Sequence, residues 1–293
     1  MKILLFGKNG QLGWEAQRTL ASLGEIHAFG SKELDLTRLD QLEKLIRKIR
    51  PQIIVNASAY TDVDRAEAEA DLAMTINANA PGVMAVEARA LNAVFVHYST
   101  DYVFDGSKGS DDLEEDGTNP LNVYGQSTLA GEQAIGQVGG ASVILRTSWV
   151  YSLRGNSFVT KVLSWARKQK TLKIVSDQIG SPTWARMLAK ITSAMLARSM
   201  TAPHEYFMER SGVYHLGGSG SVSRFDFARA ILQWDQQLQE QITDRIEPAL
   251  TSDFPTPAKR PLETPLDCSL FERVFGLQLP GWEESLRLAL GGE

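Results

Sequence analysis

The sequence is poor in the residues that build disulfides and most transition-metal sites. It has one cysteine, Cys268, and four histidines among 293 residues. A single cysteine excludes an internal disulfide, and the histidines at positions 27, 97, 204 and 215 show no metal-ligand spacing. We therefore expect neither a disulfide framework nor a metal site built from these residues, and the sequence leaves a Mg²⁺ requirement open.

An excess of positive charge and long apolar runs are also missing. Thirty basic residues stand against 35 acidic ones, and the net charge of −5 argues against an electrostatic nucleic-acid binder. It does not argue against phosphorylated small molecules. No apolar run approaches the roughly 20 residues of a membrane span, and the short run after Lys2 is far below a signal-peptide core. We expect a soluble cytoplasmic protein with no nucleic-acid or membrane partner.

What the chain does have is an alternation of short apolar runs and helix-like segments. The strands predicted in the first half are residues 2–6, 26–29, 53–56, 93–98 and 142–149. Helical periodicity separates them, and continuous apolar strands joined by helices indicate a parallel sheet covered on both faces. The predicted fold class is therefore α/β, with a doubly wound parallel (Rossmann) sheet.

The second half has a mixed pattern that predicts a smaller domain. We expect residues 1–150 to form the Rossmann domain and residues 151–293 mainly a substrate domain. The two are interleaved, because strands near 172–176 and 212–216 are expected to return to the main sheet. The acidic segment 106–120 has two interpretations, a solvated loop or a mobile lid.

Three glycines, Gly7, Gly10 and Gly13, follow the first predicted strand directly. Such glycines let the backbone turn tightly and approach a pyrophosphate, while the N-terminus of the next helix faces the negative charge. The spacing is G-x-x-G-x-x-G rather than G-x-G-x-x-G, so a purely structural turn is the competing interpretation. The position within a strand–turn–helix unit favours dinucleotide binding.

The end of the second predicted strand bears on the choice between NAD and NADP. An acidic residue there would bond the ribose 2′-hydroxyl and repel a 2′-phosphate. This sequence has Ser31 and Lys32 before its first acid, Glu33. Lys32 could pair with the phosphate, with a solvated surface lysine as the alternative, and Asp35 and Leu36 follow where an adenine could rest. NADPH is the expected cofactor, with NADH as the alternative.

Polar side chains gather at the end of the fourth predicted strand and again further along the chain. Thr100 and Asp101 stand at the strand end, where ligands bind in parallel sheets. Tyr124 lies in a turn that enters a helix. A hydroxyl such as Thr100 beside Tyr124 can protonate a carbonyl oxygen as a hydride arrives at its carbon. A half-buried helix tyrosine is the alternative for Tyr124 alone, but the glycine turn favours the catalytic interpretation.

Several motifs together resemble the extended short-chain dehydrogenase/reductases, and within them the family of dTDP-4-dehydrorhamnose reductases. They are the glycine turn, NASAYTDVD at 56–64, STDYVF at 99–104, NVYG at 122–125, RTSWVY at 146–151, DQIGSPT at 177–183 and PTPAKRP at 255–261. The resemblance covers nearly the whole chain. It implies hydride transfer from a nicotinamide cofactor to C4 of dTDP-4-dehydro-β-L-rhamnose, with a dTDP-sugar as the partner molecule.

The resemblance also implies roles for single residues. Tyr124 would be the acid and Thr100 its hydroxyl partner, and Asp101 and Trp149 would contact the sugar. The residues implied at the cofactor are Gly7, Gly10, Gln11, Leu12, Asp35, Leu36, Ala59, Tyr60, Thr61, Tyr98 and Tyr124. That Arg260 faces the substrate diphosphate is a hypothesis from charge and position, with a surface arginine as the alternative.

The chain departs from the family pattern at one position. The tyrosine motif is Tyr-x-x-x-Lys, with both side chains on one helix face, but the residue four places after Tyr124 is Thr128. The lysine would hold the nicotinamide ribose and lower the pKa of a phenol that is about 10 when unperturbed. The next lysine, Lys161, is far along the chain. Losing acid–base help costs on the order of 10²–10⁴-fold in rate, so we expect a slow or disabled reductase.

Other functions stay open at this point. One is a non-catalytic NADP-binding regulatory subunit on the same fold, similar to the regulatory subunit of methionine adenosyltransferase; another is a different nucleotide-sugar reductase or epimerase. A dehydratase is disfavoured, because Asp101 is followed by Tyr102 and not by a second carboxylate. The sequence leaves the oligomeric state open, with a homodimer as one option.

Overall fold

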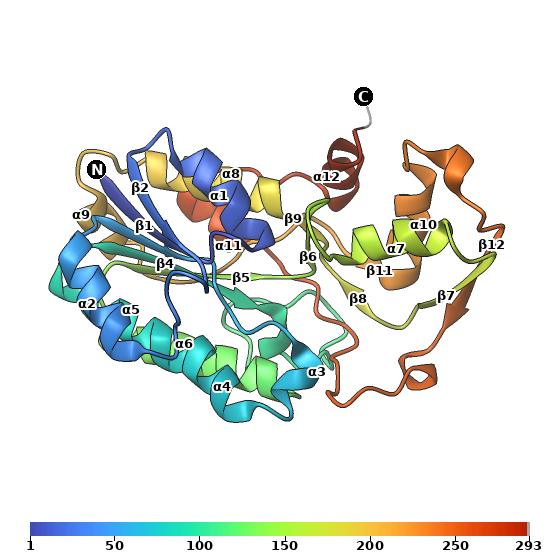
Figure 1. The fold of residues 1–293 in the computed structure, drawn as a ribbon, viewed down its shortest axis with the longest axis horizontal. Helices are drawn as coiled ribbons and strands as arrows, with labels where there is room; N and C mark the ends of the chain where they lie inside the picture. Colours follow the sequence, from blue (N-terminus) through green and yellow to red (C-terminus); the bar gives the residue numbers. More distant parts are fainter. Residues whose placement is uncertain (292–293) are drawn as a thin grey trace.

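Six parallel strands form the central sheet of the larger part of the molecule (Figure 1). The computed structural model describes residues 1–291. From edge to edge the strands are β10 (Gly212–His215), β5 (Ser142–Thr147), β4 (Val94–Thr100), β3 (Ile53–Asn56), β1 (Lys2–Phe6) and β2 (Glu25–Phe29). All their pairings are parallel. The predicted α/β class with a parallel sheet is confirmed.

Alternate residues of each central strand enter different cores, which explains why the strands are apolar throughout. In β1, Ile3 and Leu5 pack on one face of the sheet, while Leu4 and Phe6 pack on the other. The first face is covered by α1 (Gln11–Leu20), α8 (Ala185–Ala197), α9 (Pro203–Met208) and α11 (Ser269–Phe275). The opposite face is covered by α2 (Leu39–Ile49), α5 (Ala80–Ala90) and α6 (Val123–Val138).

Short helical segments occupy two connections that follow the strands. After β3 come α3 (Val63–Ala66), α4 (Ala70–Met74) and the π-helical turn η1 (Thr75–Asn79), which runs directly into α5. After β4 comes the 3₁₀ turn η2 (Asp101–Val103), for which Thr100 is the N-cap and accepts a hydrogen bond from the backbone N–H of Tyr102. The turn therefore begins at the carboxyl edge of the sheet.

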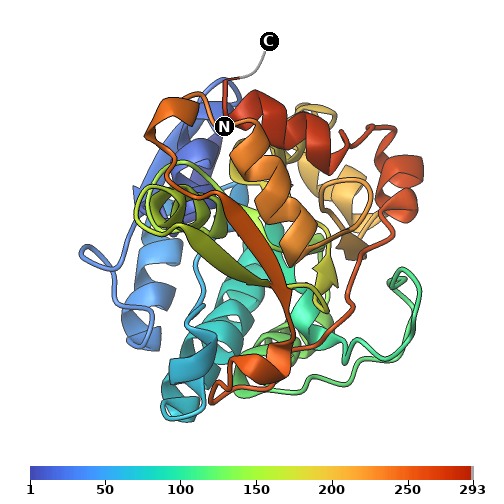
Figure 2. The ribbon, with the colours of Figure 1, turned by 90° about the vertical axis from the view of Figure 1, so that its right-hand side faces the viewer.

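The smaller part of the molecule has a core of its own. Its helices are α7 (Phe158–Ala166), α10 (Arg224–Gln233) and α12 (Trp282–Ala289), with the short turns η3 (Leu238–Glu240) and η4 (Thr251–Asp253). Its strand pairs are β7 (Thr171–Val175) with β12 (Arg245–Ala249), β8 (Ile179–Gly180) with β11 (Val222–Ser223), and β6 (Val150–Tyr151) with β9 (Thr183–Trp184). Figure 2 faces this part and shows β7 and β12 in front of the rest of the molecule.

One expected strand return is confirmed and one is wrong. Strand β10 covers the predicted segment 212–216 and lies at the edge of the main sheet beside β5. The segment 172–176 does not reach that sheet, because β7 pairs instead with β12 in the smaller part. Leu172 and Ile174 are buried in the smaller core, while Thr171 and Lys173 are exposed. This alternation suits a sheet with one solvated face, unlike the fully buried central strands.

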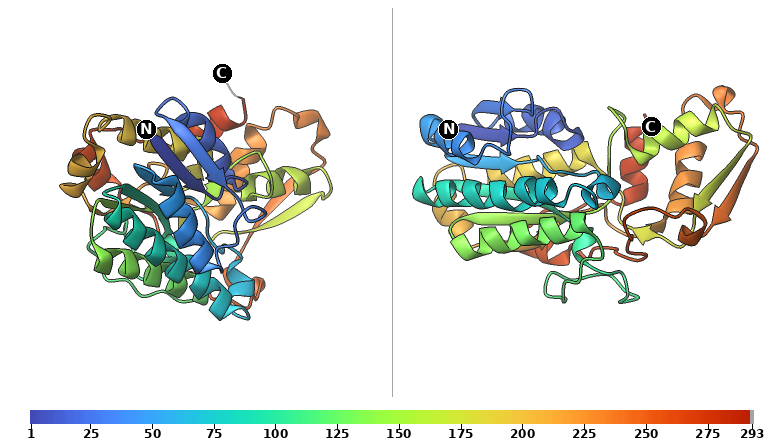
Figure 3. Two further views of the ribbon diagram at one scale, coloured as in Figure 1. Left: turned by 60° about the vertical axis from the view of Figure 1, so that its left-hand side comes forward. Right: turned by 60° about the horizontal axis from the view of Figure 1, so that its bottom comes forward.

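The acidic segment 106–120 is fastened at the edge of the larger part, where Figure 3 shows it as a projecting loop. The backbone N–H of Asp112 donates to the carbonyl of Pro265 at 2.8 Å, and Asp112 forms a parallel bridge with Leu266. The Lys108 ammonium pairs with Asp116 at 2.5 Å. These contacts fix the backbone of the segment despite its many acidic residues.

Among residues 1–291 there is no helix with the length and apolar character needed to cross a membrane.

Candidate functional site

Two neighbouring cavities lie where the carboxyl ends of the main strands meet the smaller part. The large cavity, of about 660 Å³, is lined by residues that follow β1, β3, β4 and β5 and by residues from the smaller part. The small cavity, of about 310 Å³, lies within the smaller part and reaches Tyr102. Phe158 and Arg224 line both. The large cavity is placed where ligands bind in doubly wound sheets, at the point where the strand order reverses between β1 and β3.

The structure brings most of the predicted site residues to the large cavity. Those that line it are Gly7, Gly10, Gln11, Leu12, Ser31, Ala59, Thr61, Tyr98, Thr100, Asp101, Tyr124 and Trp149. The predicted residues that do not line it are Gly13, Lys32, Asp35, Leu36, Tyr60, Thr128 and Arg260. No residue of 106–120, all of which are described, lines either cavity, so the lid interpretation gains no support.

The glycine turn is tight because side chains have no room there. Gly7 has a φ of 85°, and a Cβ on it would lie 2.5 Å from the carbonyl oxygen of Ala57. A Cβ on Gly13 would lie 2.1 Å from the carbonyl oxygen of Gly7, which explains why Gly13 packs beneath the turn instead of lining the cavity. Helix α1 begins after Gly10 without a side-chain cap, so its N-terminus faces the cavity uncapped.

This turn fits the diphosphate of a dinucleotide. The uncapped N-terminus of α1 offers backbone N–H groups and the positive end of the helix dipole to an anion. The side-chain oxygen of Gln11, which lines the cavity, is buried and has no hydrogen-bond partner in the described chain. Hydroxyl groups of a dinucleotide's ribose could donate to it, whereas the diphosphate itself has no donor.

At the end of β2, the charged side chains do not lie where the sequence predicted them. Lys32 is exposed and lies outside the cavity lining. Glu33 accepts a hydrogen bond from the backbone N–H of Gly30 at 3.0 Å and pairs with Lys8 at 2.9 Å. Asp35 is engaged by Thr37 through the backbone N–H at 2.9 Å and the hydroxyl at 2.8 Å, and these bonds hold its pKa below the usual value. Of the two acids, Glu33 is therefore the one bonded to a residue of the cavity lining, Gly30.

Tyr124 is positioned by the first turn of α6. Asn122 caps this helix by accepting a hydrogen bond from the backbone N–H of Gly125 at 2.8 Å. The ring of Tyr124 meets the edge of Tyr102, with 5.7 Å between the ring centroids. Burial raises the pKa of the Tyr124 phenol to about 12, although a hydrogen bond with Thr100 opposes that rise. Thr100 and Tyr124 line the same cavity, and Thr100 is near enough to act on the pKa of the phenol.

Asp101 is buried directly beneath this pair. Its Oδ1 accepts a hydrogen bond from the Thr100 hydroxyl at 3.1 Å, and its Oδ2 accepts from Ser148 at 2.9 Å and Thr264 at 2.8 Å. Burial raises the pKa of the Asp101 carboxyl, and the three hydroxyl donors act against that rise. The carboxylate therefore fixes the direction of the Thr100 hydroxyl.

Trp149 enters the large cavity with a constrained backbone. Its φ of 44° lies in the left-handed region, which is uncommon for a residue with a Cβ. Its indole packs against Gly180, where an added Cβ would lie only 2.6 Å from the ring. The cation of Arg224 covers the ring at 3.4 Å from its centroid.

The side chain of Thr128 bonds its own helix and cannot supply the positive charge that a lysine would supply at this position. It is buried, and its hydroxyl donates to the backbone carbonyl of Tyr124 at 2.8 Å. No cation is among the groups of the described chain that shift the pKa of the Tyr124 phenol. Folding does bring Lys161 from α7 to the lining of the large cavity. Within residues 1–291, Thr100 is therefore the group that lowers the pKa of the Tyr124 phenol, and no cation adds to that effect.

Three further predicted residues have partners that define their positions. The hydroxyl of Tyr60 donates to Glu69 at 2.5 Å, which turns it away from the cavity. Tyr98 lines the cavity, and its hydroxyl is hydrogen-bonded to Thr192 at 2.6 Å. Arg260 lines the small cavity and pairs with Asp64, with nitrogen–oxygen distances of 3.0 and 2.8 Å.

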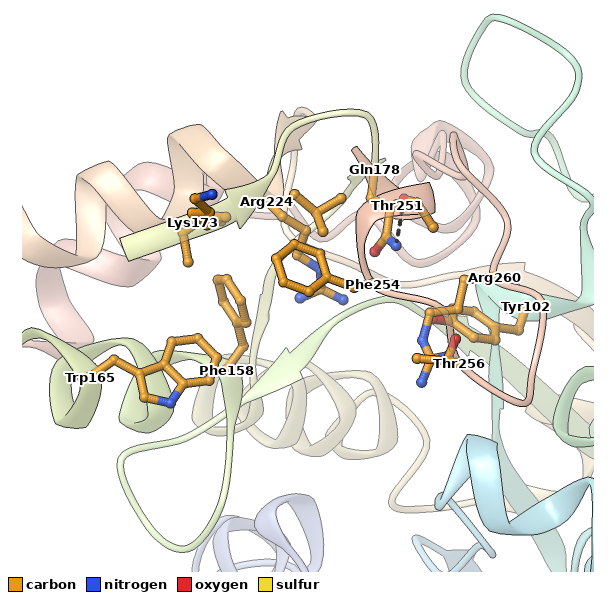
Figure 4. A pocket seen from close by; sticks show the side chains of 12 residues that line it. Tyr102, Phe158, Trp165, Lys173, Gln178, Arg224, Thr251, Phe254, Thr256 and Arg260 are labelled. Atoms are coloured by element: carbon orange, nitrogen blue, oxygen red, sulfur yellow. Dashed lines mark hydrogen bonds between the residues drawn. The ribbon is translucent and has the colours of Figure 1, made fainter. Parts of the chain in front are cut away.

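The small cavity combines aromatic rings with cations (Figure 4). Phe158 and Trp165 lie at one end, Arg260 and Tyr102 lie at the other, and Arg224 lies between them. Lys173 also lines it, and Gln178 donates to the Thr251 hydroxyl at 3.1 Å along its wall. Flat rings and positive charge are the features that bind a nucleotide base and its phosphates.

Sequence reasoning missed Arg224 and had no basis for placing Lys161 at the cavity. Arg224 is the first residue of α10, where a cation opposes the helix dipole. That unfavourable position was the available signal of a special role. Lys161 offers no such signal, because a lysine in a surface helix is ordinary.

Comparisons with known proteins agree along the whole chain. Residues 1–291 match the model of the RmlD substrate binding domain. The chain is 41% identical to the dTDP-4-dehydrorhamnose reductase of Burkholderia thailandensis, with 99% of this chain and 98% of that protein covered. It is 39% identical to the reductase of the same name from Escherichia coli K12, with 99% and 97% covered.

Solved structures give the same result. A dTDP-4-dehydrorhamnose reductase from Clostridium acetobutylicum superposes with a TM-score of 0.90 at 33% identity, covering 99% of this chain and 98% of that one. The Bacillus anthracis reductase, crystallised in complex with NADP, gives 0.87 at 35% identity, covering 98% and 97%. The UDP-glucose 4-epimerase of Thermus thermophilus, at 18% identity and a TM-score of 0.79, shares the fold. The chain belongs to the RmlD substrate binding domain family, whose members named here are dTDP-4-dehydrorhamnose reductases.

Proposed function

We propose that this protein reduces the C4 ketone of dTDP-4-dehydro-β-L-rhamnose to give dTDP-L-rhamnose, with NADPH as the hydride donor and NADH as an alternative. One observation carries the proposal: Tyr124 and Thr100 meet in the same cavity as the glycine turn. A proton donor and a dinucleotide site in one cavity are what carbonyl reduction requires. The relative from Bacillus anthracis was solved with NADP, which supports the choice of cofactor.

The cofactor would lie along the carboxyl edge of the sheet. Gly7, Gly10, Gln11 and Leu12 would hold its diphosphate at the N-terminus of α1, and Ser31 would lie toward its adenosine half. The residues that would line its path to the nicotinamide are Ala59, Thr61, Tyr98 and Tyr124. When bound, the cofactor supplies a hydride.

Tyr124 would supply the proton. Its pKa of about 12 keeps the phenol protonated at neutral pH, which is the form needed to donate to the ketone oxygen. Thr100 would give that oxygen a second hydrogen bond once its single proton turns from Asp101, which accepts it in the free protein. Trp149 would pack against the sugar ring. Because no lysine lowers the barrier to proton loss from Tyr124, we expect turnover slower than in a reductase with an intact Tyr-x-x-x-Lys motif.

The nucleotide of the substrate would occupy the small cavity. Phe158 and Trp165 offer ring faces to the thymine, and Lys173, Arg224 and Arg260 offer positive charge to the diphosphate. Because Phe158 and Arg224 line both cavities, the sugar would extend from the small cavity toward Tyr124.

This assignment also gives the domain division. Residues 1–150 would be the cofactor-binding domain, to which β10 also contributes, and residues 151–293 mainly the sugar-nucleotide domain. We place the protein in the cytoplasm, where dTDP-sugars and NADPH would meet, and consider a homodimer as its assembly.

The loss of the motif lysine also supports a second candidate, a non-catalytic NADP-binding subunit. The two are separated by following NADPH oxidation with dTDP-4-dehydrorhamnose and measuring dTDP and NADPH binding by calorimetry. The reductase assignment predicts measurable turnover and binding of both nucleotides. Binding of NADPH without turnover and without dTDP binding would instead support the second candidate.

A further inference from the structure

A buried ion pair joins the helix of Tyr124 to the two strands beside it. The side chains of Glu132, from α6, and Arg146, from β5, are each only 5% exposed. Two hydrogen bonds of 2.9 and 2.7 Å run from the guanidinium to the two oxygens of the carboxylate. The hydroxyl of Ser99, from β4, donates to the same carboxylate. One carboxylate therefore fastens α6 to both β4 and β5.

The partners of this carboxylate stand next to residues of the large cavity. Ser99 and Arg146 lie side by side in the parallel pairing of β4 with β5, and each is the last residue but one of its strand. Thr100 follows Ser99 and lines the large cavity. On α6, Glu132 lies two four-residue steps after Tyr124, and residues four apart share one helix face. The contact therefore links the element that carries the phenol to the element that carries the hydroxyl.

Glu132 itself is placed for neither ligand binding nor acid–base chemistry. It lines neither of the two cavities, and it is not among the groups of the described chain that shift the pKa of the Tyr124 phenol. A buried ion pair also adds little net stability, because taking both charges out of water offsets their attraction. What such a pair supplies is geometry, since two parallel hydrogen bonds set both distance and direction.

No other side chain of α6 can do the same. Glu132 is the only charged residue among the 16 residues of this helix. The position of the motif lysine is occupied by Thr128, whose hydroxyl bonds its own helix. The ion pair with β5 is therefore the one charged contact by which side chains of α6 fix the helix on the sheet.

We infer that Glu132 is a positioning residue for the proposed reduction, which holds α6 at the distance from β4 that places Tyr124 beside Thr100. The inference rests on the proposed function. Reacting groups must approach to about 3–3.5 Å, and a misplacement of about 1 Å can cost about 10²-fold in rate. Breaking the contact should therefore slow the chemical step and leave ligand binding in place.

The test separates position from stability with three variants of the pair. Glu132→Gln removes the negative charge. Arg146→Lys keeps both charges but loses the paired geometry, because an ammonium is a point charge. The double variant Glu132→Leu/Arg146→Met removes both charges and fills the space with apolar atoms, an exchange that is often neutral or stabilising for a buried pair.

The matched control is Glu87→Gln, which breaks a paired arginine contact elsewhere on the sheet. Glu87, from α5, is buried and accepts hydrogen bonds from Arg47 of α2 at 2.8 and 2.9 Å. Neither residue lines the large or the small cavity. For each protein, kcat and KM are measured with dTDP-4-dehydrorhamnose, dTDP and NADPH affinities by calorimetry, and Tm by thermal unfolding.

We expect Glu132→Gln and Arg146→Lys to lower kcat by about 10- to 100-fold, with KM and both affinities within about threefold of the wild type. The double variant should recover most of the Tm that Glu132→Gln loses, while its kcat stays low. Glu87→Gln should lose Tm but keep kcat within about twofold, since distant sites act independently. A low kcat in a stable protein that still binds both nucleotides is the signature of lost position.

Three results would overturn the inference. A folded Glu132→Gln protein with the kcat of the wild type would show that packing alone positions α6. A double variant that regains kcat together with Tm would show that the pair acts only through stability. An equal fall of kcat in Glu87→Gln would show that the loss is not particular to this pair.

A failure of Glu132→Gln to fold does not remove the test, because Arg146→Lys and the double variant are judged by the same criteria. In the three contradicting cases the wild type still turns over. A wild type without turnover contradicts the proposed function, and the inference falls with it.

Discussion

The two cavities differ in where they carry positive charge. The small cavity holds Lys173, Arg224 and Arg260 within about 310 Å³, together with aromatic rings. At Tyr124, in the large cavity, hydroxyl groups and the buried carboxylate of Asp101 surround the phenol, and Thr128 stands where a lysine would supply a cation. The small cavity is therefore rich in cations, whereas no cation of the described chain acts on the Tyr124 phenol, although Lys161 and Arg224 line other parts of the large cavity.

This contrast teaches that recognition and proton transfer depend on separate groups. The cations of the small cavity act on a ligand with fixed negative charge, so their value is in affinity. A cation beside Tyr124 acts on a proton that moves only during reaction, so its value is in rate. A chain can therefore have the cations that bind the ligand and lack the cation that assists proton transfer. The predictions below test that separation, from the largest expected effect to the smallest.

Replacing Tyr124 with phenylalanine should nearly abolish turnover. We expect kcat to fall by about 10²–10⁴-fold, because no other phenol takes its place beside Thr100. Steady-state NADPH oxidation measures the loss, and calorimetry should show dTDP and NADPH affinities within about threefold of wild type. The matched variant is Tyr102→Phe, whose ring contacts Tyr124 edge-on and which should lose far less. A Tyr124→Phe protein that keeps most of its activity would contradict the assignment.

Replacing Asp101 with asparagine should reduce kcat/KM by about 10- to 100-fold. Asp101 accepts hydrogen bonds from three hydroxyl groups, and an amide nitrogen cannot accept one. The Thr100 hydroxyl would lose its fixed direction. The control is Ser148→Ala, which removes one of the three bonds and leaves that of Thr100. Equal losses in the two variants would show that Asp101 acts through packing and not through Thr100.

A buried carboxyl outside both cavities should affect stability but not turnover. Burial raises the pKa of Asp112 from its ordinary value to about 7, and its Oδ2 has no hydrogen-bond partner in the described chain. The folded protein holds this proton more tightly than the unfolded chain, so the wild type loses stability as pH rises from about 4 to about 7. Asp112→Asn avoids that loss.

Thermal unfolding of wild type and Asp112→Asn at pH 5 and pH 8 checks this prediction. The variant should gain on the order of 2 kcal/mol relative to wild type between the two pH values, with kcat unchanged. A difference that does not vary with pH would mean that the carboxyl is not held neutral by burial. A change in kcat would revive the lid interpretation of residues 106–120.

The smallest effect should be on cofactor preference. Glu33 lies against Gly30 at the edge of the large cavity, and Lys8 offsets its charge. Glu33→Gln removes a carboxylate near the ribose, so the ratio of kcat/KM for NADPH over NADH should rise by about two- to fivefold, since exposed charges act weakly. Lys32→Gln is the companion variant. If Lys32 pairs with the 2′-phosphate, the ratio falls; an unchanged ratio would leave Lys32 as a surface residue.

Much of the larger part could be predicted from local pattern. The fully buried run of β3 and the helix α2 before Pro51 end where the sequence indicated, because the apolar residues, helical periodicity and proline act locally. The meeting of Thr100 and Tyr124 was also predictable. Thr100 follows from the rule that ligands bind at the carboxyl edge of a parallel sheet. Tyr124 lies in α6, and its position follows from the motif resemblance.

The smaller part was harder because its contacts join distant segments. Strand β7 pairs with β12, which lies more than seventy positions further along the chain. The sequence of neither segment indicates which strand it pairs with. The signal that was present lies in β7 itself, where exposed and buried residues alternate and indicate a solvated face. Arg224 shows the same limit, since only folding reveals that its guanidinium stacks on Trp149.

The measurement that tests the account most directly compares pH profiles of kcat/KM for the wild type, Thr128→Lys and the uncharged, similarly long Thr128→Met. A Tyr124 pKa of about 12 predicts a wild-type rate that is low and nearly flat up to about pH 10, because the protonated phenol persists. Thr128→Lys should raise kcat/KM by about 10²-fold, and its kcat/KM should begin to fall at a lower pH than in the wild type. Thr128→Met should show neither change. Equal rates and profiles in wild type and a folded Thr128→Lys would contradict the central claim that the missing cation limits proton transfer.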